Sequence, residues 1–179
     1  QLAERIVDEN TRQTVAIVLY HLPMTLFGPN KRKQAHAKKM ARQARDRVLK
    51  FCKDYTAKDA SKVMGLGPHD VHNLRAGNGL SLLMLVRLVT NGRFGPNSVL
   101  RGKSLRKLRK GTLTRGVRCE LITKRINKIA RDGSPQEIAR DTGLAAITIY
   151  NFRTKPPQSV SLHTVINFLE SGYSIKQLL

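Results

Sequence analysis

Apolar side chains recur at helical spacing through the last third of the chain. One run follows Ser161 and places four such residues on a single helical face: Leu162, Val165, Ile166 and Leu169. An earlier run lies between Ser134, a good helix N-cap, and Gly143, which can end a helix in the left-handed conformation. A helix from about Ala145 to Arg153 is expected next, and it should end before Pro156 because proline cannot continue a helix. The pattern therefore predicts short helices joined by tight turns.

The same order of helices is expected in the first half of the chain, because the sequence contains an internal repeat. Residues 56–66 align with residues 134–144, and the match continues without a gap through the helix that follows. After a short insertion in the second copy, Ser81 aligns with Ser161. The apolar run from Leu82 to Val89 would then be the most buried helix of the first repeat.

The helical pattern and the repeat divide the chain into four regions of an all-α fold. We expect an N-terminal extension at residues 1–37, a first helical unit at residues 38–100, a basic linker at residues 101–117 and a second helical unit at residues 118–179. The extension could form one amphipathic helix that ends before Pro23, as a core cap or as a dimer contact. We favour the cap, because terminal segments often only complete a core.

Each repeat carries the spacing of a helix-turn-helix. A glycine would make the turn, with a small residue four positions before it and an aliphatic residue six positions after it. These residues are Ser61, Gly65 and Val71 in the first repeat and Ala139, Gly143 and Ile149 in the second. With a helix before the motif and two after it, each unit resembles the DNA-binding domain of lambda repressor, Cro and their relatives. The resemblance implies two lambda-repressor-like bundles in tandem, over roughly residues 38–100 and 118–179.

The resemblance also implies which residues read DNA. In this family the second helix of the motif enters the major groove with its N-terminal residues on base edges. The matching positions are Pro68, His69, Asp70, His72 and Asn73 in the first repeat and Ala146, Ile147, Thr148, Tyr150 and Asn151 in the second. Histidine and asparagine can hydrogen-bond base edges, whereas apolar methyl groups suit the methyl group of thymine. Because the second set offers few hydrogen bonds, a protein contact is its alternative role.

The charge of the chain points to a polyanionic partner. The protein has 33 Lys and Arg residues against 12 Asp and Glu, which gives a formal net charge of +21. A compact fold with this excess repels itself unless a polyanion neutralises it. Nucleic acid is the usual polyanion and an anionic membrane surface is the alternative, but no apolar run approaches the roughly 20 residues of a membrane span. We therefore expect double-stranded DNA as the partner and no membrane.

Cations in three parts of the sequence are expected to contact phosphates: the ends of the two motif helices, the linker, and a third segment at residues 31–50. The cations late on the two motif helices are Arg75, Arg153 and Lys155. Those of the linker are Arg101, Lys103, Arg106, Lys107, Arg109, Lys110 and Arg115. The linker would track the phosphates or the minor groove between the units, or else be a solvated flexible segment. The third segment, from Lys31 to Lys50, has nine Lys and Arg residues against Asp46 and would mostly form the first helix of the first unit.

Catalysis, cofactor binding and metal binding are not expected. The acids are scattered, and neither a Ser/His/Asp pattern nor a phosphate-binding glycine loop occurs. His69 and His72 have a spacing that could bind a metal, but no set of four ligands accompanies them. Cys52 and Cys119 form no CxxC pair, so we expect reduced thiols in a cytosolic protein.

These features together predict a sequence-specific transcription regulator from a bacterium or a mobile element, associated with the nucleoid in the cytoplasm. Further candidate partners are RNA polymerase, another DNA-bound protein and a second copy of the chain. Two alternative functions share the DNA contact. One is an architectural or nucleoid protein with little sequence preference, and the other is an accessory factor of recombination, transposition or replication initiation.

Overall fold

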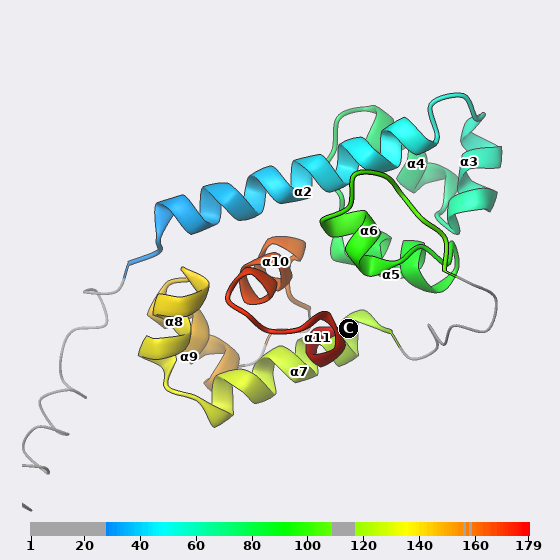
Figure 1. Cartoon of the computed structure of the whole chain (residues 1–179). Helices are drawn as coiled ribbons and strands as arrows, with labels where there is room; N and C mark the ends of the chain where they lie inside the picture. Colours follow the sequence, from blue (N-terminus) through cyan, green and yellow to red (C-terminus); the bar gives the residue numbers. More distant parts are fainter. Residues whose placement is uncertain (1–27, 109–116, 156, 158) are drawn as a thin grey trace, which may run out of the picture.

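The computed structural model describes residues 28–108, 117–155, 157 and 159–179, and within these ranges the protein is all-α (Figure 1). The first repeat contains α2 (Lys31–Phe51), α3 (Ala57–Met64), α4 (Pro68–Arg75), α5 (Leu82–Thr90) and α6 (Pro96–Leu100). The second contains α7 (Cys119–Asp132), α8 (Pro135–Thr142), α9 (Ala146–Thr154), α10 (Leu162–Glu170) and α11 (Ile175–Leu178). Helices α3, α4 and α5 begin at residues that align with the starts of α8, α9 and α10. The repeat in sequence is therefore a repeat in structure.

Short polar residues begin half of these helices by accepting a hydrogen bond from a free backbone N–H. Thr56 Oγ1 accepts from the N–H of Asp59 at 3.1 Å, and Ser161 Oγ accepts from the N–H of Thr164 at 3.1 Å. Ser134 precedes α8 as expected, but its side chain makes no capping bond and lies 3.2 Å from Gln136 Oε1 instead. Pro135 compensates in part, since its fixed backbone angle suits the first helical position.

The two glycine turns are present where the spacing predicts them. Gly65 has φ 66° and Gly143 has φ 71°, both in the left-handed region. In the first turn, the buried Ser61 donates its hydroxyl to the carbonyl oxygen of Leu66 at 2.6 Å. The aliphatic anchors Val71 and Ile149 are fully buried. Each pair, α3 with α4 and α8 with α9, is therefore held by a left-handed glycine and an apolar contact.

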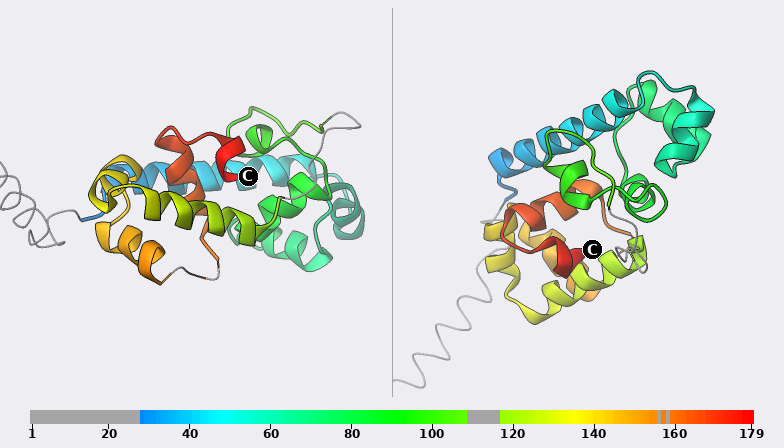
Figure 2. Two further views of the ribbon diagram at one scale, coloured as in Figure 1. Left: turned by 90° about the horizontal axis from the view of Figure 1, so that it is seen from below. Right: turned by 45° about the vertical axis from the view of Figure 1, so that its right-hand side comes forward.

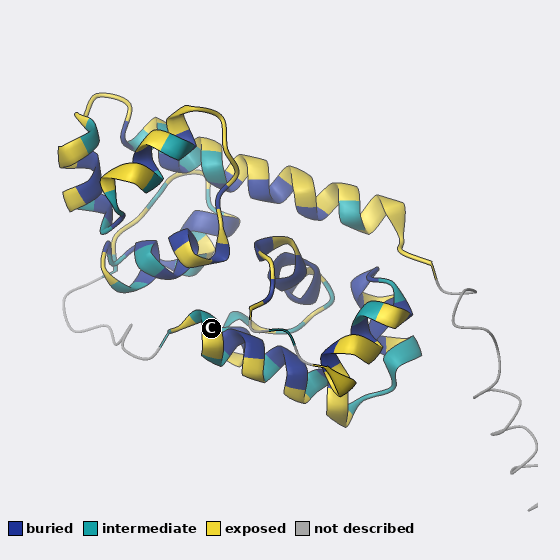
Figure 3. Ribbon diagram, turned by 180° about the vertical axis from the view of Figure 1, so that it is seen from behind, coloured by how far each residue is buried: buried dark blue, intermediate teal, exposed yellow. Residues whose placement is uncertain are grey.

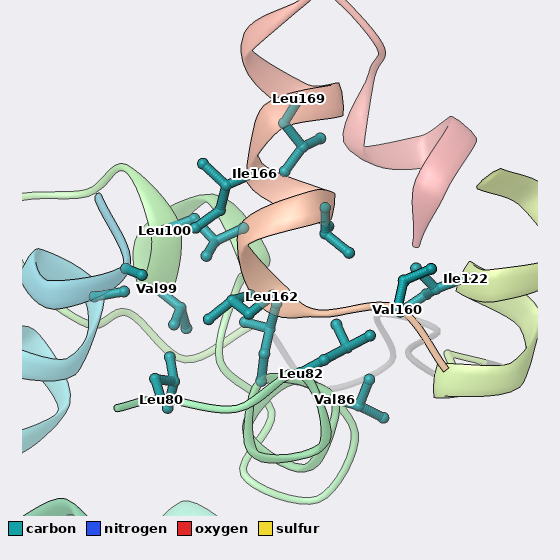
Figure 4. Packing of buried hydrophobic residues seen from close by; sticks show 14 of the residues in the cluster. Leu80, Leu82, Val86, Val99, Leu100, Ile122, Val160, Leu162, Ile166 and Leu169 are labelled. Carbon is teal, nitrogen blue, oxygen red and sulfur yellow. The ribbon is translucent and has the colours of Figure 1, made fainter. Parts of the chain in front are cut away.

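The two repeats share one hydrophobic core. Helix α2 packs against α6 of its own repeat and against α10 of the other, while α5 packs against α7. The residues that meet between the repeats (Figure 4) are Leu80, Leu82, Val86, Val99 and Leu100 from the first repeat and Ile122, Val160, Leu162, Ile166 and Leu169 from the second. Helix α5 is largely buried, as its apolar sequence indicates.

Helix α2 crosses the boundary that was expected at residue 37. Asn30 begins the helix, because its Oδ1 accepts hydrogen bonds from the N–H groups of Arg32 and Lys33 at 3.1 and 3.2 Å. Ala37 is buried within the helix, so residues 31–37 belong to the packed body and not to an extension. The expectations for residues 1–27 lie outside the described part of the chain.

The first half of the expected linker folds back on the end of the first repeat. The N–H of Gly95 donates to the carbonyl of Arg106 at 3.0 Å, and the N–H of Leu108 donates to the carbonyl of Arg93 at 2.6 Å. An isolated antiparallel bridge joins Phe94 to Lys107 between these bonds. Residues 101–108 are therefore tied to the first repeat, which contradicts the interpretation of this stretch as a solvated flexible segment. Residues 109–116 lie outside the described ranges.

Acid is expected to weaken the packing of α10 against α2 through His163. Burial lowers the pKa of His163 below its ordinary value of 6.5, and the positive charge of Lys38 lowers it further. The unfolded chain then binds the proton more readily, so stability falls as the pH drops below about 6.5. The variant His163→Gln should lose less free energy of unfolding than the parent between about pH 7 and pH 5. Urea unfolding at each pH measures this, and equal losses in both proteins would exclude His163 as the cause.

Candidate nucleic-acid interface

The two glycine-turn helix pairs lie near opposite ends of α2, with α3 and α4 at one end and α8 and α9 at the other (Figure 1). Seen from below, α9 and the α3–α4 pair both reach the same edge of the molecule (Figure 2). The outer surfaces of α4 and α9 carry exposed residues (Figure 3). A single elongated ligand could therefore contact both helices.

Helix α4 presents a polar outer face. Val71 and Leu74 are buried, which turns Pro68, His69 and His72 outward and leaves Asn73 half-buried. The two imidazoles and the amide can each donate or accept hydrogen bonds. These four residues occupy the positions that the resemblance assigns to base reading.

Asp70 does not belong to this outer face. Its Oδ2 accepts a hydrogen bond from the N–H of Gly67 at 3.0 Å and forms an ion pair with Arg87 of α5. The carboxylate thus stabilises the start of α4 and ties it to α5, so the assignment of Asp70 to base reading was wrong. The sequence held a signal for this role, since an acid in the third helical position after Gly67-Pro68 is a typical N-terminal cap.

Arg75 also has a structural role. Its Nη2 donates to the carbonyl oxygens of Cys52 at 3.1 Å and Tyr55 at 2.6 Å, which follow the last turn of α2. The carbonyl of Cys52 also accepts from the N–H of Tyr55 at 3.2 Å. The bonds attach α4 to the end of α2, and we no longer assign Arg75 to phosphate.

Helix α9 presents a face that is apolar at its start. Ile147 and Tyr150 expose 49% and 39% of their surface, Asn151 is exposed and Thr148 is half-buried. Ala146 is 3% exposed and faces the core, so it cannot read a base. The two repeats differ at this position. Ala146 aligns with Pro68, which is exposed, whereas the small side chain of Ala146 is buried.

The linker cations are divided between internal and external roles. Arg101 donates to the carbonyl of Leu169 at 2.9 Å and to Glu170 at 2.8 Å, so it joins the two repeats and is withdrawn as a phosphate ligand. Lys107 Nζ lies 5.6 Å from the centre of the Phe94 ring. Lys103 and Arg106 are exposed, as are Arg153 and Lys155 at the end of α9. Three expected phosphate ligands lie outside the described residues: Arg109, Lys110 and Arg115.

The outer side of α2 is a basic stripe that the sequence only partly revealed. Three of its cations bond within the chain: Lys33, Arg45 and Arg47. Arg47 is half-buried, and burial lowers its pKa. The other six are exposed, and none of their side chains makes a hydrogen bond or ion pair with another described residue: Lys31, Arg32, Lys38, Lys39, Arg42 and Lys50. Helical spacing places several of them opposite the buried alanines of α2 (Figure 3).

The described residues contain no group of three or more His, Cys, Asp and Glu side chains that could hold a metal ion. Among the same residues, every helix is too short or too polar to cross a bilayer. Cys52 is buried and Cys119 is half-buried, and both are free thiols. Burial raises the pKa of the Cys119 thiol, which disfavours the reactive thiolate.

Comparisons of the chain with protein-family models, with curated proteins and with solved structures found no match. The assignment of a role to the two helix pairs therefore depends on their own geometry and charge.

Proposed function

We propose that this protein is a sequence-specific double-stranded DNA-binding protein and acts as a transcription regulator of a bacterium or a mobile element. The observation that carries the proposal is the pair of glycine-turn motifs, each with a second helix whose outer residues are exposed. In lambda-repressor-like domains this helix enters the major groove. The side chains that would read bases are Pro68, His69, His72 and Asn73 on α4 and Ile147, Thr148, Tyr150 and Asn151 on α9, of which Asn73 and Thr148 are half-buried and the others exposed.

The two helices would read different chemistry. His69, His72 and Asn73 would hydrogen-bond base edges, whereas Ile147 and the methyl group of Thr148 would contact thymine methyl groups. The half-sites should therefore differ, and the site of one chain would be asymmetric rather than palindromic. The exposed cations of α2, together with Lys103, Arg106, Arg153 and Lys155, would neutralise phosphates without regard to sequence.

The basic stripe of α2 favours a second candidate function, an architectural DNA-binding protein. A row of exposed cations binds any duplex, because phosphates carry no sequence information. The two functions differ in the ratio of specific to non-specific affinity. Selection from a library of random duplexes by the full-length chain measures this ratio, and recovery of no shared sequence would favour the architectural role.

Alanine substitution on the two outer faces is expected to relax base preference. His72→Ala and Ile147→Ala should each reduce discrimination at particular base pairs of the selected site, by about 1–3 kcal/mol where a bidentate hydrogen bond is removed and by less where a methyl group is removed. Arg42→Ala on α2 is the matched control and should weaken all sequences alike. Affinities for the selected duplex and for single-base variants measure the effect.

The outcome at α9 also decides between its two candidate partners. If His72→Ala changes base preference and Ile147→Ala and Tyr150→Ala do not, α9 does not read DNA. Its exposed apolar residues would then be the contact for RNA polymerase or another DNA-bound protein. If none of these three substitutions alters base preference, α4 and α9 have been wrongly assigned as the helices that read DNA.

A further inference from the structure

We propose that α2 acts as a rigid spacer that sets the distance and helical phase between two half-sites on one DNA duplex. This inference rests on the proposed function and adds the geometry of its ligand. The distance between the two half-sites would be set by the way the two repeats pack on each other, and not by the length of the segment that joins them.

Each end of α2 is bonded to one of the two glycine-turn pairs. At its N-terminal end, the N–H of Asn30 donates to the carbonyl of Gly143 at 3.0 Å, inside the turn between α8 and α9. Lys33 Nζ donates to the carbonyls of Arg140 and Asp141 at the end of α8, at 3.1 and 2.6 Å. At the other end, Arg75 of α4 bonds the carbonyls that follow α2. One helix therefore positions both α4 and α9.

The contact at the Gly143 turn is close as well as bonded. A Cβ atom built on Gly143 would lie 2.6 Å from Lys33 Cβ, so the turn rests directly on the first turns of α2. Further along, Glu170 of α10 accepts from Arg101 and pairs with His36 at 3.2 Å. These polar bonds surround the apolar contact between α2 and α10 and leave the second repeat little freedom to rotate about α2.

The sequence of α2 makes it stiff. Its 21 residues contain neither glycine nor proline and consist largely of alanine, lysine and arginine, which are strong helix formers. From Asn30 to Cys52 the helix rises about 1.5 Å per residue, or roughly 33 Å. Half-sites one turn apart on B-DNA lie about 34–36 Å from centre to centre. The spacer therefore has the length of one turn of DNA.

The packing between the repeats is reciprocal, which reinforces the fixed geometry. The first helix of each repeat packs on the fourth helix of the other, α2 on α10 and α7 on α5. Because two separate helix pairs join the repeats, one repeat cannot easily bend or twist relative to the other. Each repeat thus contributes its first and fourth helices to the contact with the other, as the two subunits of a symmetric dimer contribute the same surface.

Spin labels test the rigidity without DNA. Labels at Lys62→Cys on α3 and Glu137→Cys on α8, in a chain with Cys52→Ala and Cys119→Ser, report the distance between the two motif pairs by pulsed electron resonance. We expect a single narrow distance, unchanged when a flexible Gly/Ser segment is inserted after Lys110. A broad distribution, or one that widens with the insertion, would overturn the proposal. Unlabelled chains with and without the insertion should show equal helical content by circular dichroism.

Duplexes of varied spacing test the consequence for DNA. The site selected by the full-length chain should contain two elements at one separation, about one helical turn. Adding about 5 base pairs between them should lower affinity by about 10²–10⁴-fold, because the second element turns to the opposite face and only one motif can bind. The chain with the inserted segment should show the same preference.

The outcomes separate this inference from the function on which it rests. Specific binding that tolerates several separations, or that gains tolerance when the segment is lengthened, overturns the fixed spacing and leaves DNA binding intact. If the chain selects no duplex at all, the proposed function fails and the spacing inference fails with it.

Discussion

Binding of this protein to duplex DNA is expected to weaken by about 10³- to 10⁵-fold when the salt concentration rises from about 50 mM to about 200 mM. A loss of this size corresponds to the release of counterions from roughly six to ten phosphates. The chain can supply that number. On α2, on the segment after α6 and at the end of α9, ten exposed cations have side chains that make no hydrogen bond or ion pair with another described residue: Lys31, Arg32, Lys38, Lys39, Arg42, Lys50, Lys103, Arg106, Arg153 and Lys155.

A triple variant tests whether α2 carries the proposed phosphate-binding surface. Lys38→Gln, Lys39→Gln and Arg42→Gln together should reduce the slope of log affinity against log salt by as much as about 2.7, or about 0.9 for each phosphate that is no longer neutralised. Base preference should not change, because these side chains lie on α2 and not on the outer faces of α4 and α9. Fluorescence anisotropy with the selected duplex, repeated over a series of salt concentrations, gives the slope.

A control with the same reduction in charge distinguishes direct phosphate binding from net charge. Lys124→Gln, Arg131→Gln and Lys176→Gln remove three exposed cations from α7 and α11. If both triple variants change the slope equally, the overall charge of the protein is responsible and not the stripe on α2. A salt response that is nearly flat in the parent chain would contradict phosphate binding altogether.

The helices and their turns could be predicted from the sequence because the signals are local. The turn at Gly65 depends on a glycine that can adopt positive φ and on Ser61 and Val71, all within a few residues of one another. The same local signals recur in the second repeat, and the alignment of the two copies strengthens both. Periodicity and caps therefore sufficed for the fold class and for the positions of α3, α4, α8 and α9.

The N-terminal extent of α2 could not be predicted from the sequence. Besides α6 of its own repeat, this helix packs against α10 of the other repeat. Ala37 and Ala41 are buried in the core that α2 shares with the second repeat, and nothing in the sequence around them indicates that contact. The repeat in the sequence itself suggested two separate units joined by a linker. The shared core forms between the apolar faces that each unit leaves uncovered by its own helices. The spacing of apolar residues along the sequence does not show which faces these are.

The helices that carry the candidate residues were predicted from the sequence, but the exposure and contacts of individual side chains were predicted less well. Position along a recognition helix identifies His72 and Ile147, which are exposed, but the same rule also included Ala146, which is buried. Arg75 was assigned to phosphate from its place late on a motif helix, and Arg101 from the charge of the linker. Each instead bonds backbone carbonyls at the end of a helix, and such a partner becomes visible only when distant segments are brought together.

The turn between α3 and α4 is expected to tolerate no side chain at Gly65. Its φ of 66° costs an ordinary residue about 1–2 kcal/mol. A Cβ atom there would also lie 2.4 Å from Asn91 Cβ, 2.5 Å from the nitrogen of Gly92 and 2.6 Å from the carbonyl carbon of Asn91. Two of these three atoms are backbone at the end of α5, so they cannot rotate away, and overpacking of this kind costs about 1–3 kcal/mol more.

Gly65→Ala should therefore lower the free energy of unfolding by about 2–5 kcal/mol, a large part of the roughly 5–15 kcal/mol typical of a domain. Gly77→Ala is the matched control. Gly77 also has positive φ, at 95°, but a Cβ atom there would meet nothing within 4 Å, so only the backbone cost applies. Urea unfolding of the two variants isolates the contact between the turn and α5. Equal losses would show that the contact between the turn and α5 does not hold α4 in place.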